Sequence, residues 1–217
     1  MLICCWSSKG GAGTTVVAAA LALMLASRSP AGALLADLGG DAPTALGLPM
    51  DAAGPGITDW LCSESTRPRE LRVAPGLALW PHGSGPPPPA GDGADRLLDA
   101  LLADPRPVVV DAGVIGAPTA HGELALAVAS AATHSLLVVR QCFMALRRAL
   151  LAPLRPSAVV LIEDVGRALT AADIEEALGV PVRARVHTTA QIARVVDAGL
   201  LAVALPRSLE RDLRDAA

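Results

Sequence analysis

Apolar positions fall into short runs that recur along the chain, with longer segments of mixed polarity between them. Uninterrupted apolar runs of this length are typical of strands buried on both faces of a parallel sheet. The predicted strands cover residues 2–6, 33–37, 108–111, 135–140, 158–162 and 182–186. Helical patterns separate them, so the sequence predicts an α/β fold. We expect a three-layer α/β/α arrangement around a mostly parallel, doubly wound sheet, with a single domain over residues 1–217.

Two of the intervening segments show different kinds of helix. Residues 16–26 are an unbroken run of valine, alanine, leucine and methionine, as in a buried helix, whereas residues 95–103 carry leucines on one side only. Residues 70–73 and 77–80 flank a Pro-Gly turn and predict a strand pair. The four prolines at 86–89 predict an exposed polyproline II loop.

A glycine-rich turn follows the first strand and precedes the first helix. Glycines let backbone N–H groups turn inward, and the helix N-terminus adds partial positive charge, which suits phosphate. A threonine just inside the helix is placed to put its hydroxyl on a phosphate-bound Mg²⁺. The alternative is a flexible turn with a solvated lysine. The candidate phosphate-binding residues are Lys9, Gly10, Gly11, Ala12, Gly13, Thr14 and Thr15.

The loop departs from the usual phosphate-loop pattern G-x-x-x-x-G-K-[ST]. Thr14 stands where that pattern has lysine, and a lysine comes early, at Lys9. The chain has 18 lysines and arginines in total, and Lys9 is the only lysine among them. An ammonium and a guanidinium are not interchangeable against phosphate oxygens, so the retained lysine indicates a specific role.

This segment resembles the deviant phosphate loop of the MinD/ParA family of ATPases, K-G-G-x-G-K-[ST]. The resemblance implies ATP and Mg²⁺ as cofactors and a homodimer in which Lys9 reaches the partner's nucleotide. It also implies that the second lysine of the pattern, replaced by Thr14, would hold the phosphates within its own subunit. The matching residues are Lys9, Gly10, Gly11, Gly13 and Thr15.

Carboxylates follow two of the predicted strands, at the edge where open α/β sheets bind ligands. The second strand of the family ends in Asp-x-Asp, with the first Asp near the metal and the second positioning the attacking water. Asp37 matches the first, Gly39 replaces the second, and Asp41 would have to reach in from the next loop. Alternatively, Asp37 and Asp41 satisfy N–H groups of the turn. Asp111 ends a Walker B-like strand, which places it with Thr15 at the metal.

Further motifs extend the resemblance over nearly the whole chain. The weakened loop, the turn at 37–41 and Leu46-Gly47-Leu48 look most like the CpaE/TadZ branch, whose members act in pilus or secretion-system localisation and septum placement. The segment Asp197-x-Gly199 also matches the family. Relatives read adenine, often with Asn, near Glu163-Asp164, and two acids there argue against the usual adenine contact.

Composition limits the classes of partner that we expect, namely nucleic acids and membranes. The net charge is −3 and the chain has no tyrosine and one phenylalanine, so there is no strong nucleic-acid signal. No apolar run has the ~18 residues of a membrane span, and the N-terminus does not resemble a signal peptide, so we expect a cytoplasmic protein. The C-terminal segment 206–215 mixes charges around two leucines and predicts no stable membrane anchor. The four cysteines lack metal-ligand spacing.

Three functions stay open on these observations. The first is an ATP-dependent dimeric switch that localises an unknown protein partner, with weak or absent hydrolysis because Thr14 and Gly39 remove charged groups. The second is a pseudo-ATPase that binds a protein partner or another nucleotide, such as a cyclic dinucleotide. The third is an active ATPase in which an arginine replaces the missing lysine.

Overall fold

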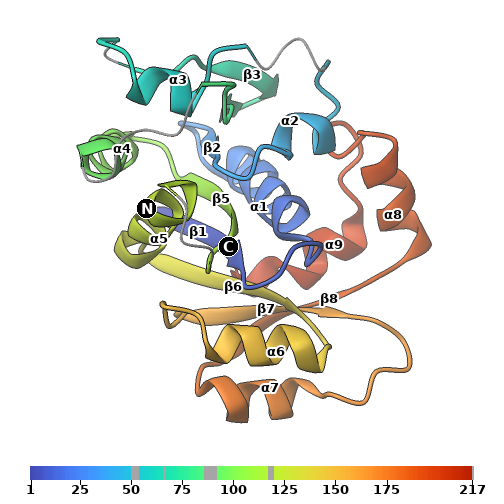
Figure 1. The fold of residues 1–217 in the computed structure, drawn as a ribbon. Coiled ribbons are helices and arrows are strands. Elements are labelled where there is room, and N and C mark those ends of the chain that lie inside the picture. Colours follow the sequence, from blue (N-terminus) through green and yellow to red (C-terminus); the bar gives the residue numbers. More distant parts are fainter. Residues whose placement is uncertain (50–53, 66, 86–91, 117–119, 217) are drawn as a thin grey trace.

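A computed structural model describes residues 1–49, 54–65, 67–85, 92–116 and 120–216, so the prolines at 86–89 lie outside the described residues. Within these ranges eight strands form one sheet, in the order β3-β4-β2-β5-β1-β6-β7-β8 (Figure 1). Neighbouring strands are parallel, except that β3 and β4 pair antiparallel. The strands are β1 Leu2–Ser7, β2 Ala33–Asp37, β3 Leu71–Ala74, β4 Leu77–Trp80, β5 Val108–Val114, β6 His134–Arg140, β7 Ala158–Glu163 and β8 Val182–His187.

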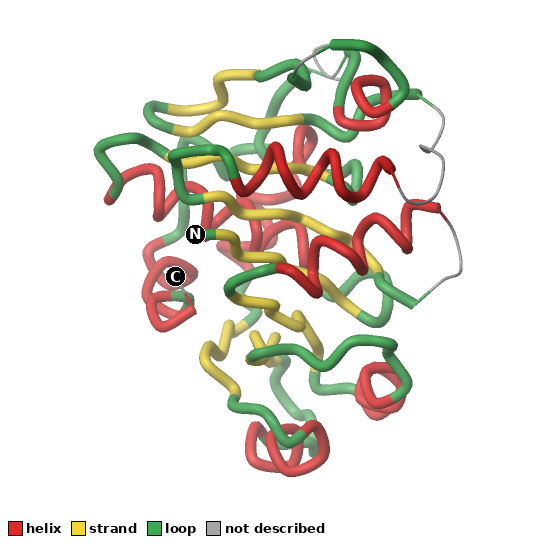
Figure 2. Tube along the Cα trace, turned by 90° about the vertical axis from the view of Figure 1, so that its left-hand side faces the viewer, coloured by secondary structure: helices red, strands yellow, loops and turns green. Residues whose placement is uncertain are grey.

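Helices cover both faces of this sheet, which confirms the predicted α/β class and mostly parallel sheet (Figure 2). Helices α1, α8 and α9 pack in one apolar layer, and α3 to α7 pack in the other. Their bounds are α1 Thr14–Arg28, α2 Ala42–Ala45, α3 Ile57–Leu61, α4 Asp92–Leu102, α5 Ala120–Ala131, α6 Phe143–Leu150, α7 Ala171–Leu178, α8 Ala190–Asp197 and α9 Arg207–Asp212, with a 3-10 turn at Arg214–Ala216.

Strand β1 shows why the central strands are apolar throughout. Leu2, Cys4 and Trp6 face one layer of helices, whereas Ile3 and Cys5 face the other, and all five are buried. Successive side chains of a strand point to opposite faces, so a strand covered on both faces needs no polar positions. None of the helices in the described parts of the chain combines the length and apolar character needed to cross a bilayer.

Strand register places the predicted site residues at one end of the sheet. Asp111 of β5 pairs with Cys5 of β1 on one side and with Asp37 of β2 on the other. The loop after β1 therefore emerges beside both carboxylates and leads directly into α1.

Candidate functional site

The loop between β1 and α1 has a backbone that requires glycine. Gly11 and Gly13 have φ of 75° and 92°, a region in which L side chains are strained. A Cβ added at Gly10, Gly11 or Gly13 would meet nothing within 4 Å. The loop is therefore open on its ligand side, and the glycines serve its conformation rather than tight packing.

A cleft of about 600 Å³ opens on this loop. It is formed by residues 10–16, by the turn after β2 and by residues 112–114 at the end of β5. Of the predicted site residues, Asp41 and the six from Gly10 to Thr15 line this cleft. Lys9 lines a second cavity on the other side of the loop.

Asp111 is a buried carboxylate with spare hydrogen-bonding capacity. Its Oδ1 accepts a hydrogen bond from the Gly113 N–H at 3.1 Å, and its Oδ2 has no hydrogen-bond partner within the described residues. Burial raises the pKa of Asp111, while the nearby Thr15 hydroxyl and the Gly113 N–H lower it and the charge of Asp41 raises it. An orphaned carboxylate oxygen next to a threonine hydroxyl is a suitable pair of oxygen ligands for Mg²⁺.

No three His, Cys, Asp or Glu side chains within the described residues form a metal-binding cluster. A Mg²⁺ ion commonly takes one or two protein ligands and completes its shell with water and phosphate oxygens. Thr15 and Asp111 fit such an ion only together with a phosphate-bearing ligand.

The carboxylate of Asp37 is occupied by the turn that follows it. Oδ1 accepts from the N–H groups of Gly39 at 3.0 Å and Gly40 at 2.7 Å, and Oδ2 accepts from Ala42 at 3.1 Å. Burial, and then the nearby charge of Asp111, raise the pKa of Asp37 to about 7, while these amides oppose the rise. These hydrogen bonds are the ones expected from the alternative interpretation, in which the carboxylate of Asp37 satisfies N–H groups of the turn.

Gly39 lies against the buried carboxylate of β5. A Cβ at Gly39 would lie 3.3 Å from Asp111 Oδ2, and a Cβ at Gly113 would lie 3.2 Å from the Cα of Gly39. A side chain at Gly39 would therefore be in tight contact with the carboxylate of Asp111. Asp41 is exposed in the cleft, and although it precedes α2 its side chain makes no capping hydrogen bond.

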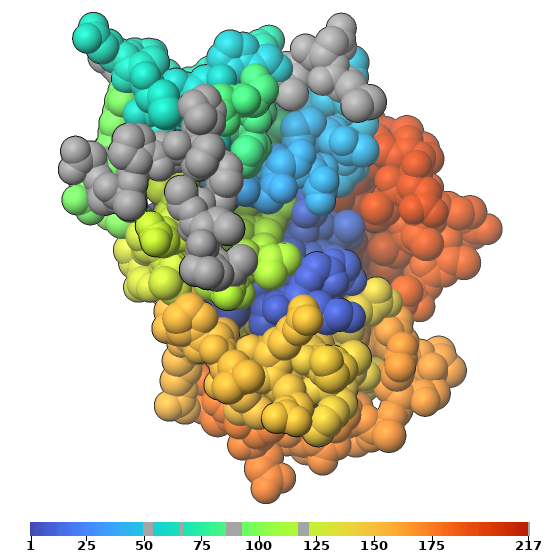
Figure 3. All heavy atoms as spheres, in the orientation of Figure 1, coloured from blue at the N-terminus to red at the C-terminus, as the bar shows by residue number. Residues whose placement is uncertain are grey.

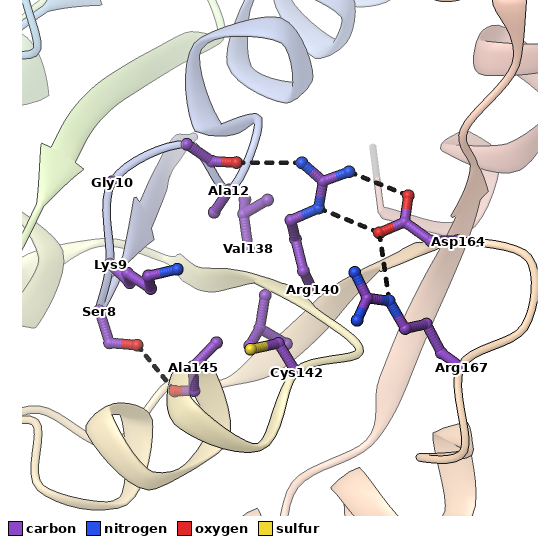
Figure 4. Close-up of a pocket in the computed structure, with 12 residues that line it drawn as sticks. Ser8, Lys9, Gly10, Ala12, Val138, Arg140, Cys142, Ala145, Asp164 and Arg167 are labelled. Carbon is purple, nitrogen blue, oxygen red and sulfur yellow. Dashed lines mark hydrogen bonds and ion pairs between the residues drawn. The ribbon is translucent and has the colours of Figure 1, made fainter.

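The lysine position of the usual pattern holds a buried threonine. The Thr14 hydroxyl has no hydrogen-bond partner within the described residues. The guanidinium of Arg140, at the end of β6, instead approaches the loop and donates from Nη1 to the Gly11 carbonyl at 3.3 Å (Figure 4). Arg140 was not predicted from the sequence, and the adjacency of β1 and β6 is what brings it to the loop.

The two acids after β7 are already paired. Asp164 accepts from Arg140 Nη2 at 2.9 Å, and Glu163 pairs with Arg185 at 2.9 Å and His187 at 3.1 Å. These arginines and the histidine occupy the carboxylates at this edge of the sheet.

Neither protein-family models nor curated protein sequences give a match to this chain. Solved structures do. The MinC:MinD cell division complex of Aquifex aeolicus gives a TM-score of 0.78 at 18% identity, over 98% of this chain and 95% of that one. The chain has the fold of the MinD and ParA ATPases.

Two further structures agree with this MinD/ParA fold. The ParA family ATPase of Chlorobium tepidum gives a TM-score of 0.73 at 18% identity, over 99% of this chain and 96% of that one. The septum site-determining protein MinD of Pyrococcus horikoshii, complexed with Mg-ADP, gives 0.75 at 16% identity, over 98% and 93%. The predicted fold is thereby confirmed, and the CpaE/TadZ branch stays a prediction.

Proposed function

We propose that this chain is a MinD/ParA-type nucleotide-binding protein whose ATP-dependent homodimer localises a protein partner, with weak or absent hydrolysis. The carrying observation is the loop: its glycines hold an open conformation with positive φ, and it faces a buried carboxylate that has an unpaired oxygen within the described residues. Maintaining two positive-φ glycines and an orphaned buried oxygen costs stability, which favours a site that has been kept for a ligand.

In this proposal the backbone N–H groups of residues 10–15 hold the phosphates, together with the N-terminus of α1. Thr15 and Asp111 would hold Mg²⁺, which neutralises phosphate charge when it is bound. Lys9 is exposed and makes no hydrogen bond or ion pair within the described residues, so it is available to a neighbouring subunit. We propose that Lys9 contacts the partner's nucleotide.

Weak hydrolysis follows from the groups that surround the loop. Thr14 brings no charge to the phosphates, and Gly39 brings no carboxylate to a water. Removing one charge-stabilising group commonly costs about 3 kcal/mol of transition-state stabilisation. Asp37 and Asp41 stay candidates for the catalytic role. The carboxylate of Asp37 accepts hydrogen bonds from three backbone N–H groups.

The CpaE/TadZ-like process, pilus or secretion-system localisation or septum placement, belongs to this proposal too, on the motifs at 37–41 and 46–48. A second candidate function is a pseudo-ATPase that binds only a protein partner or another nucleotide. The uncharged Thr14 in the lysine position favours it.

Calorimetric titration with Mg-ATP, with the protein's mass measured in solution before and after, separates these functions. We expect saturable binding and an ATP-dependent doubling of mass, with Asp111→Asn weakening the Mg-ATP complex and Lys9→Ala abolishing the doubling. Asp95→Asn, which removes an equivalent charge from α4, is the matched control. Absence of binding at millimolar Mg-ATP would leave the pseudo-ATPase function.

Restoring the family lysine tests the placement of Thr14. An ammonium next to the phosphates adds a charge-assisted contact, so Thr14→Lys should tighten Mg-ATP binding about tenfold or more. Thr14→Met, which adds length without charge, should not. Equal affinity of wild type and Thr14→Lys would show that residue 14 does not face the phosphates.

A further inference from the structure

A groove of about 400 Å³ lies between the end of α6, the segment 152–156 and the end of α7. Helices α6 and α7 lead into the first residues of β7 and β8, whereas the candidate phosphate-binding loop follows the last residue of β1. Strands β1, β6, β7 and β8 are parallel, so the groove and the loop lie at opposite edges of the sheet. Figure 3 shows the gold α6 region at the surface, in the lower part of the view.

Apolar side chains form most of the groove. On one wall Leu150 is 54% exposed, and Pro153 and Leu154 follow it along the chain. Ala177 and Leu178 at the end of α7 form the opposite wall. Large apolar side chains that gather on an exposed, concave surface mark a docking site more often than isolated exposed ones do.

A hydrogen bond between the two walls fixes the shape of this groove. Arg155 Nη2 donates to the carbonyl of Gly179, the C-cap residue of α7, at 2.7 Å. Pro153 and Pro156 restrict the backbone on either side of Arg155, and Pro156 is buried. The walls are thus held in place by the protein itself, so a partner would not lose binding free energy in ordering them.

The wall that comes from α6 and the segment after it is basic. Residues 143–157 contain Arg147, Arg148 and Arg155 and no aspartate or glutamate. None of these arginines has an ion-pair partner within the described residues. Glu176 is the one carboxylate among the described residues that line the groove, and it makes no hydrogen bond or ion pair there. Three unpaired cations and one unpaired carboxylate leave a positive field, which attracts an acidic ligand.

We propose that this groove binds an amphipathic helix of a partner protein, with large apolar side chains on one face and acidic residues beside them. A helix docks in such a groove through apolar anchors at positions i, i+3 and i+4. Its acidic residues would face the arginines of residues 143–157. The inference rests on the proposed function only in that this partner would be the protein that the dimer localises.

Two other occupants fit the groove less well. A bilayer surface gains little contact inside a concave groove, and Glu176 repels anionic lipids. A second copy of the chain, bound about a two-fold axis, would present the same surface and bring two sets of unpaired arginines together.

Selection from a peptide library tests the chemistry of the ligand. The probe is a phage-displayed library of helical peptides with randomised surface positions, selected on the whole protein without nucleotide. Enriched peptides are then synthesised with a fluorescent label and measured by fluorescence anisotropy. We expect leucine-like side chains at i and i+3 or i+4, flanked by aspartate or glutamate, and an affinity that falls as the salt concentration rises.

Substitution of an apolar lining residue locates the peptide on the protein. Leu150→Ser removes an exposed anchor contact and should weaken binding at least about tenfold. Val203 is 80% exposed and lies between α8 and α9, away from the groove, so Val203→Ser is the matched control and should bind the peptides as the wild type does.

Charge variants test whether the ligand is acidic. Glu176→Gln removes the carboxylate from the wall and should tighten binding of the enriched peptides about threefold, a gain that a merely structural role of Glu176 would not produce. Arg148→Gln should weaken binding by a similar factor and reduce its salt dependence. Glu210→Gln on α9 and Arg72→Gln on β3 remove exposed charges elsewhere and are the matched controls.

Several results would overturn this inference. Selection could enrich no peptide, or only peptides with basic residues in place of the acidic ones. Binding that Leu150→Ser leaves unchanged would put the peptide outside the groove. Sedimentation of the protein with phosphatidylserine vesicles, if Leu150→Ser abolished it, would make a membrane the occupant. A nucleotide-free doubling of mass that Leu150→Ser abolished would make a second copy the occupant.

These outcomes can be separated from those that test the proposed function. Leu150→Ser lies at the opposite edge of the sheet from the loop and should bind Mg-ATP as the wild type does. A failure of Mg-ATP binding with intact peptide binding would therefore refute the nucleotide-dependent function alone, and the reverse pattern would refute the groove alone.

Discussion

The buried carboxylate of Asp37 should make the stability of the fold fall as pH rises towards about 7. It lies at the end of β2, fully buried, and burial together with the charge of Asp111 raises its pKa to about 7 against three opposing amide hydrogen bonds. In the unfolded chain the same group has its ordinary value of 3.8. Between these two values the folded protein holds a proton that the unfolded chain has released.

The sign and size of the effect follow from this difference. The proton stabilises the folded state fully below the ordinary pKa, and its contribution is lost as pH rises through about 7. Each pH unit within the window corresponds to about 1.4 kcal/mol, so the whole window is worth about 4 kcal/mol. Asp37→Asn cannot titrate, so the variant should lack this part of the pH dependence.

Urea unfolding at a series of pH values measures the effect. Between about pH 5 and about pH 7, the wild-type free energy of unfolding should fall by about 1.4 kcal/mol per unit more than that of Asp37→Asn. Asp59→Asn is the matched control, because the Gly56 N–H lowers the pKa of Asp59 and moves its titration below this window. Asp111→Asn should also flatten the slope, since burial raises the pKa of Asp111. The reasoning fails if Asp37→Asn keeps the wild-type slope.

Three substitutions test the local packing, each by the midpoint of urea unfolding. Gly39→Asp brings a carboxylate against Asp111 and should cost about 3 kcal/mol or more, whereas a stable variant with wild-type structure would refute the close approach. Gly47→Ala puts a Cβ at φ 77° into the Gly199 carbonyl and should cost at least about 3 kcal/mol; an unchanged midpoint contradicts this. Thr170→Ala removes the N-cap of α7 and should cost about 1 kcal/mol, with Thr170→Ser nearly neutral.

The fold could be predicted because its central strands are apolar on both faces. Runs such as 2–6 and 158–162 lie within the strands Leu2–Ser7 and Ala158–Glu163, since two layers of helices leave no polar position to interrupt them. Helix α2, Ala42–Ala45, was missed. It has four residues, with proline in its first turn, and is too short to show helical periodicity.

The loop of the candidate site could be predicted because glycines at fixed positions mark a local backbone requirement. The contact between Arg140 and the Gly11 carbonyl could not, since it spans 129 residues of sequence and depends on the order of the strands. The same holds for Asp37: its position at a strand end was predictable, but its three amide donors come from the exact path of the turn.

Two motifs that support the MinD/ParA resemblance pack against each other. Gly47 follows α2 and Gly199 follows α8, and their backbones meet so closely that a Cβ at Gly199 would lie 3.1 Å from the Gly47 Cα. Both residues have positive φ, so glycine is favoured at each position by its backbone conformation as well as by the close contact. These motifs therefore bear on the fold, which the structural comparisons also support. The case for a nucleotide depends on the loop, Thr15 and Asp111, and only direct binding measurements on variants of those residues test it.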